Sequence, residues 1–169
     1  MTTINSIALS ALPAVYDQFA ASPIGALVQC RPRTAGDSDL VVGLRCDVMD
    51  IAYSKMMPGI VLLDGEARGT YKSVIDLVHP GAIDVSNLLT INVRNPAPQP
   101  ANYTQSVGTL YVDAATLKVY MWSHFPRDHL WVCVSDPQGS DRGQCAAALD
   151  ITRFVELGEP MLAPIERPD

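Results

Sequence analysis

The chain has 169 residues, a length that fits one domain able to bury a sizeable hydrophobic core. Hydrophobic residues make up 48% of it and charged residues only 18%, which excludes an intrinsically disordered protein. The formal net charge of −6 argues against nucleic-acid binding, because contacts to phosphates need a positive field.

The N-terminal segment predicts an extended arm and then one short helix. Residues 1–9 mix polar and apolar side chains and predict the arm. Apolar side chains then recur at helical spacing after Ser10, a good helix cap, so residues 10–21 predict a helix. The segment has no basic start and no continuous apolar core, so we expect neither a signal peptide nor a membrane span.

Beyond the helix the pattern becomes that of short strands separated by turns rich in Gly and Pro. Three prolines within residues 95–102 predict a surface loop, and three more predict an extended C-terminal arm over 160–169. The expected strands are residues 25–32, 39–51, 59–64, 70–78, 88–94, two within 108–125, 129–136 and 144–155. The chain is therefore expected to be a single, mainly β domain: an antiparallel β-sandwich or barrel with one short N-terminal helix and extended termini.

The clearest of these elements is the stretch "GTLYVDAATLKVYMWSHF", residues 108–125, which predicts two strands around a four-residue turn. Asp113 is placed to hold that turn by bonding the backbone ahead of it. In the second strand, Tyr120 and Trp122 alternate with inner-face residues and so share the opposite face, together with Lys118. That face is either offered to a partner or buried in a central strand. The expected inner-face residues are Leu110, Val112, Leu117, Val119 and Met121.

The segment "GTLYVDAATLKVYMWS", residues 108–123, resembles hairpins of the form G-x-L-Y-x-D-x-x-T-x-x-V-Y-x-W that recur in structural proteins of tailed bacteriophages. It departs from that form at Leu117, where a glycine usually closes the turn. The resemblance implies a small capsid- or tail-associated virion protein whose partners are other protein subunits, either copies of itself or a major shell or tail protein.

Composition bears on the same question. The chain has nine Arg and only three Lys, and Lys is depleted where protein surfaces meet; drift of composition in a GC-rich host is the alternative explanation.

The C-terminal arm carries apolar side chains with little of its own domain to fold onto. The candidate partner-contact residues are Tyr120, Trp122, Met161, Leu162 and Ile165.

The motif "HFPRDH" places His124 and His129 five residues apart, with Asp128 beside the second. Two strand ends could hold a metal in this way, but zinc sites normally have three or four protein ligands, and a third, such as His79, would have to come from afar. The spacing therefore favours exposed loop histidines. With no GxSxG motif present either, we expect no catalytic residue, no cofactor and no metal, and a protein that is not an enzyme.

The four cysteines stand in or beside apolar, strand-like runs, and their spacing matches no zinc motif. We expect free, buried thiols, with disulfides as the alternative, and assembly in the host cytoplasm. The cysteines are Cys30, Cys46, Cys133 and Cys145.

Three functions are compatible with these features. The first is a structural component of a virion or similar assembly, acting through protein–protein contacts. The second is a small intracellular binding or inhibitor module. The third is a small β-barrel enzyme that uses the His124–His129 loop.

Overall fold

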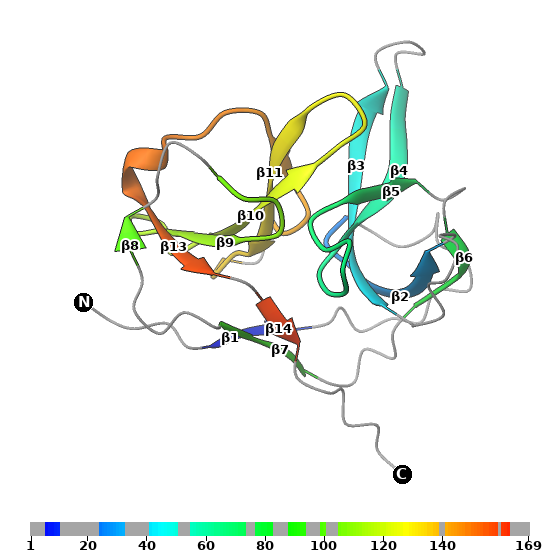
Figure 1. Ribbon diagram of the computed structural model, residues 1–169, viewed down its shortest axis with the longest axis horizontal. Helices are drawn as coiled ribbons and strands as arrows, with labels where there is room; N and C mark the ends of the chain where they lie inside the picture. Colours follow the sequence, from blue (N-terminus) through cyan, green and yellow to red (C-terminus); the bar gives the residue numbers. More distant parts are fainter. Residues whose placement is uncertain are drawn as a thin grey trace.

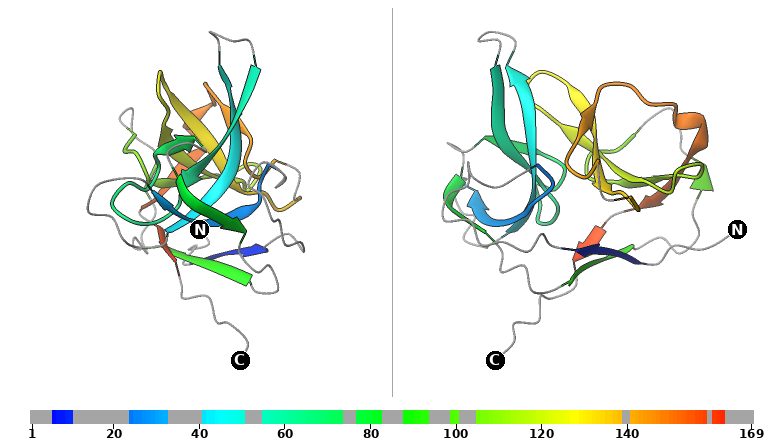
Figure 2. Two further views of the ribbon diagram at one scale, coloured as in Figure 1. Left: turned by 90° about the vertical axis from the view of Figure 1, so that its right-hand side faces the viewer. Right: turned by 180° about the vertical axis from the view of Figure 1, so that it is seen from behind.

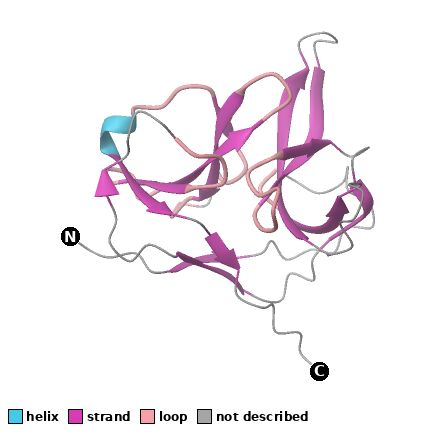
Figure 3. Ribbon diagram, viewed as in Figure 1, coloured by secondary structure: helices cyan, strands magenta, loops and turns pink. Residues whose placement is uncertain are grey.

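The computed structural model describes residues 6–10, 24–32, 41–50, 55–73, 77–82, 88–93, 99–100, 105–138, 141–158 and 160–162. Within these residues the protein is mainly β, as the sequence predicts (Figure 3). The one helical element described is a 3-10 turn, η3 (Ile151–Arg153), in which Asp150 caps the first backbone N–H groups.

The strands form three sheets in which every strand pairing is antiparallel. The five-stranded sheet, in the order β5-β4-β3-β2-β6, contains β2 (Leu27–Pro32), β3 (Val41–Asp50), β4 (Lys55–Leu62), β5 (Tyr71–Ser73) and β6 (Leu77–Ala82). The six-stranded sheet, in the order β12-β11-β10-β9-β13-β8, contains β8 (Gln99–Pro100), β9 (Leu110–Asp113), β10 (Val119–His124), β11 (His129–Ser135), β12 (Cys145–Ala146) and β13 (Phe154–Gly158). The three-stranded sheet, in the order β1-β7-β14, contains β1 (Ser6–Ser10), β7 (Leu88–Val93) and β14 (Pro160–Leu162).

The two large sheets share one hydrophobic core and so form a sandwich. Alternate residues of each sheet point toward the other, for example Leu44 and Val61 from one sheet and Leu110 and Met121 from the other, and all four are completely buried. Figure 1 shows the two sheets beside each other, with the three-stranded sheet beneath both, and the view from behind in Figure 2 agrees.

Two pairs of glycines hold the chain close where the large sheets meet. A Cβ built on Gly69 would lie 2.5 Å from the backbone N of Gly108, and one built on Gly143 would lie 2.5 Å from the backbone N of Gly25. All four residues have φ between +81° and +90°, which side chains other than glycine rarely adopt. The close approach of the two sheets therefore depends on glycine at these positions.

The hairpin turn is built as expected around Asp113. Its Oδ1 accepts hydrogen bonds from the backbone N of Ala115 at 2.8 Å and of Thr116 at 3.4 Å, and its carbonyl accepts one from Leu117 at 2.7 Å. The inner-face placement of Leu117 is wrong. This leucine lies in the turn at φ 62°, the left-handed conformation that a glycine would take, and 58% of it is exposed.

The structure describes part of the N-terminal segment for which the sequence predicts an arm and a helix. Ser10, predicted to begin a helix, is the last residue of strand β1; the rest of the predicted helix, 11–21, lies outside the described residues. All of the described part of the N-terminal arm, residues 6–9, lies in β1, which pairs with β7 from Ser6↔Asn92 to Ser10↔Leu88. Hydrogen bonding to a distant strand, which the local pattern does not reveal, decides this conformation.

Two proline-rich segments also join sheets. Gln99 and Pro100, expected in a loop, form β8 against Glu156 and Val155 of β13. Pro160–Leu162, expected in the C-terminal arm, form β14 against β7. Both lie at the edge of their sheet, where one side of the backbone needs no ladder partner and proline is tolerated. The predicted strand 70–78 is in turn two strands, β5 and β6.

Candidate functional site

The outer face of the six-stranded sheet carries a cluster of aromatic side chains. Strands β9, β10 and β11 alternate between the shared core and this face, and Trp122 lies directly opposite Trp131 on the paired strands. The aromatic face, as we name it, comprises Tyr111, Tyr120, Trp122, Trp131 and Phe154, which form a second hydrophobic cluster with part of the segment 146–151.

Trp131 is the centre of the aromatic face. Its ring meets those of Tyr111 and Phe154 edge to face, at centroid distances of 5.2 and 5.0 Å, and that of Trp122 at 4.7 Å. Tyr120 stacks on Phe154 at 5.5 Å. Such ring pairs stabilise by about 0.5–1.5 kcal/mol each beyond the burial of their area. Trp131 and Phe154 are almost fully buried, so the middle of this face is a packed core.

The candidates Tyr120 and Trp122 lie at the margin of this face and are half-buried. Burial raises the pKa of Tyr120, the nearby Cys133 acting in the same direction. The hairpin is thus intermediate between the two expected arrangements: its outer face is largely covered by the protein's own chain, and only the margin is accessible.

The other candidates lie elsewhere. Met161 and Leu162 belong to β14 and pair with Asn92 and Ile91 of β7, so the structure does not bring them into the six-stranded sheet. Ile165 lies outside the described residues.

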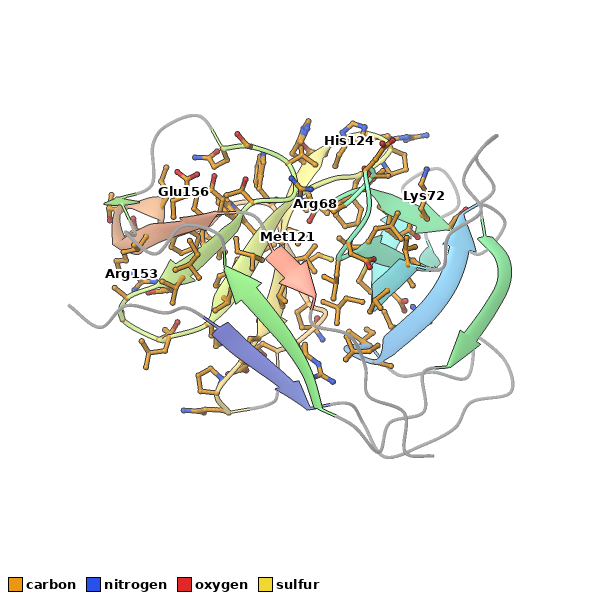
Figure 4. All side chains as sticks on the ribbon, turned by 60° about the horizontal axis from the view of Figure 1, so that its bottom comes forward. Arg68, Lys72, Met121, His124, Arg153 and Glu156 are labelled. Atoms are coloured by element: carbon orange, nitrogen blue, oxygen red, sulfur yellow. The ribbon has the colours of Figure 1, made fainter. Side chains whose placement is uncertain are left out.

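The two histidines lie at the loop end of the β10–β11 hairpin, on either side of the connecting residues 125–128. His124 ends β10, His129 begins β11, and the two are directly paired across the strands. The Nδ1 atom of His124 lies 3.3 Å from Nε2 of His129, and both residues are exposed. The ring of His129 also stacks on that of Trp122 at 5.6 Å, nearly parallel at 15°. The histidines are therefore on strand ends and in contact. In Figure 4 His124 lies at the periphery, whereas Met121 lies in the interior.

Within the described residues, no group of three or more His, Cys, Asp or Glu side chains is arranged to hold a metal ion. His79 lies in β6 of the five-stranded sheet, and its side chain is outside the described part.

A contact between thiols was not foreseen in the sequence. Cys46 lies on β3 and is fully buried, and its thiol is hydrogen-bonded to that of the half-buried Cys145 on β12. This contact joins the two large sheets. Burial raises the pKa of Cys46, whereas the hydrogen bond from Cys46 lowers that of Cys145. The two residues are far apart in the sequence, and no local signal pairs them.

The expectation of free, buried thiols is confirmed for Cys46 and Cys133, while Cys145 is free but only half-buried. The side chain of Cys30 lies outside the described residues. Burial raises the pKa of Cys133 to about 12, and the charges of Asp136 and Asp141 act in the same direction.

Comparison with protein-family models, with curated proteins and with solved structures found no match for this chain. In the part of the chain that is described, no helix is both long and apolar enough to cross a membrane.

Proposed function

We propose that the protein is a structural component of a virion or a similar assembly and acts through contacts with other protein subunits. The observation that carries the proposal is the three-stranded sheet, whose two edge strands come from segments near the two ends of the chain. Strand β7 lies in its middle, and β1 and β14 lie at its two edges; among the described residues, neither edge strand pairs with a strand of a large sheet (Figure 1).

An edge strand presents backbone N–H and C=O groups along its outer side and is a template for a further strand. In this sheet both edges come from the segments near the chain ends, where the sequence places apolar residues such as Ile7, Leu9, Met161 and Leu162. A second subunit that pairs with either edge would extend the sheet while leaving the sandwich unchanged. The virion setting rests on the resemblance of the 108–123 hairpin to phage structural proteins.

The half-buried margin of the aromatic face supports the same proposal. Tryptophan and tyrosine dominate the binding energy of protein interfaces when partly exposed rings become buried. The ring of Trp122 contacts those of Trp131 and His129 and is still only half-buried, so a partner could bury more of its area.

The proposal is tested by light scattering coupled to size exclusion, over a wide range of protein concentration. We expect the untagged full chain to form oligomers, and Met161→Lys at the β14 edge to shift it toward the monomer. Leu117→Lys is the matched control, because it also replaces an apolar residue by lysine but lies in the exposed hairpin turn. A chain that stays monomeric at every concentration would contradict self-assembly and favour the binding-module alternative.

A further inference from the structure

The contact between His124 and His129 has the geometry of two ligands of one metal ion. Zinc is bound by histidine nitrogen at about 2.0–2.1 Å, almost always in a tetrahedral arrangement. Two nitrogens on such an ion are about 3.3–3.4 Å apart, whereas at a right angle on a square-planar ion they would be about 2.9 Å apart. The observed separation of Nδ1 and Nε2 is 3.3 Å.

We propose that His124 Nδ1 and His129 Nε2 form a two-ligand site for Zn²⁺ at the loop end of the β10–β11 hairpin. Both side chains are exposed, so an ion reaches them directly from solvent. Two positions of a tetrahedral ion remain for water, because the described residues supply no third side chain. This is an exchangeable surface site and is distinct from the closed four-ligand sites that hold a fold together.

The neighbouring residues hold the backbone of both histidines, and the ring of His129, in place. The backbone N of His124 donates to the carbonyl of Gly69 at 2.8 Å, which fixes the end of β10 on the other large sheet. The backbone N of His129 donates to Oδ1 of Asp128 at 2.8 Å, and its ring lies flat on Trp122. Ligands fixed before binding lose less conformational entropy when the ion arrives.

The proton arrangement is also consistent with binding. A neutral imidazole has one N–H and one free lone pair, so the ligating forms carry the proton on Nε2 of His124 and on Nδ1 of His129. Zinc then replaces the present nitrogen-to-nitrogen contact by two coordinate bonds, and one ring moves its proton from one nitrogen to the other.

The test uses untagged full-length protein stripped with a chelator and titrated with ZnCl₂ in a calorimeter. We expect one Zn²⁺ per chain with micromolar affinity, and at least tenfold weaker binding by His124→Gln and by His129→Gln. His79→Gln is the matched control, because it removes the only other histidine of the chain, and it should bind like the unmodified protein. MgCl₂ should give no signal, because Mg²⁺ requires oxygen ligands.

Fluorescence gives a second readout at the site itself. Cu²⁺ bound to His129 lies close to the stacked Trp122 and should quench its emission at stoichiometric concentration, and the quenching should disappear in His124→Gln. The proposal is overturned if Zn²⁺ binds only at millimolar concentration, or if a variant lacking both histidines binds as well as the unmodified chain. Circular dichroism of each variant verifies that it is folded.

Discussion

Arg153 donates a hydrogen bond through Nη2 to Oδ2 of Asp113 at 2.9 Å, and so joins η3 to the turn between β9 and β10. The Asp113 side chain is only 4% exposed, and its other oxygen accepts two backbone hydrogen bonds of the turn. The Arg153 side chain is 49% exposed, so solvent screens the ion pair. The backbone bonds to Asp113 should therefore contribute more to stability than the ion pair does.

We expect Asp113→Ala to lower the free energy of unfolding by about 2–3 kcal/mol, because it removes three hydrogen bonds to a buried carboxylate. Asp113→Asn retains an acceptor for the turn and should cost roughly 1 kcal/mol, as should Arg153→Ala. Urea unfolding measures all three variants. If the alanine and asparagine variants lose equal free energy of unfolding, the charge of Asp113, and not its hydrogen bonds to the turn, stabilises the protein.

The second prediction concerns Leu117 at φ 62°. A side chain in the left-handed conformation costs roughly 1 kcal/mol relative to glycine, and this exposed leucine makes little compensating contact. Leu117→Gly should therefore raise the free energy of unfolding by about 0.5–1 kcal/mol. Leu117→Ala keeps the strained conformation and is the control; a similar gain from both variants would attribute the effect to the exposed apolar side chain.

The third prediction separates backbone strain from steric clash at the glycines. Gly143→Ala brings a Cβ to 2.5 Å from the backbone N of Gly25 and 2.6 Å from the carbonyl O of Arg45, so it should cost more than about 3 kcal/mol. Gly65→Ala has a similar φ of +80°, but its new Cβ meets only Val41 Cγ1 at 3.2 Å, so it should cost roughly 1 kcal/mol. Thermal melts of both variants, compared at one temperature, test the difference; similar losses would contradict a tight approach of the two sheets.

Thiol reactivity supplies the fourth prediction. At pH 8 a thiol-specific disulfide reagent should modify Cys145 first, because it is half-buried and its pKa is lowered by the hydrogen bond from Cys46. Cys46 and Cys133 should react slowly until the protein unfolds, because both are buried and have raised pKa values. Cys145→Ser should remove the rapid phase. A rapid phase that survives this substitution would assign the reactivity to another thiol.

The fifth prediction is a loss of stability in alkali. The native Cys133 thiol has a pKa of about 12, whereas an unperturbed thiol has one of 9.0. Between these values the unfolded state binds fewer protons than the native state, so the free energy of unfolding falls as pH rises. Deprotonation of this one thiol should lower the free energy of unfolding by about 1 kcal/mol between pH 8 and pH 10. Cys133→Ala should flatten that part of the pH profile; an unchanged slope would contradict the prediction.

Local sequence patterns determine most of the secondary structure of this protein. Alternation of apolar residues predicted most of the strands, and Asp113 marked the hairpin turn, because side-chain period and turn chemistry act over a few residues. The resemblance to phage hairpins marked Leu117 as the place where a glycine is usual, whereas the local alternation of side chains assigned that residue to the wrong face. The left-handed φ of Leu117 shows why a glycine suits the position.

The tertiary structure alone decided which distant segments meet. Ser6–Ser10 and Pro160–Leu162 are strands because β7 lies between them, and Gln99–Pro100 is a strand because β13 offers it an edge. The contact of Cys46 with Cys145, the fit of Gly143 against Gly25 and the 3.3 Å separation of the two histidine nitrogens likewise depend on how strands are paired and packed. Such contacts arise because whole sheet faces become buried. The free energy of this burial is a sum over the domain, so it cannot be predicted from any short stretch of sequence.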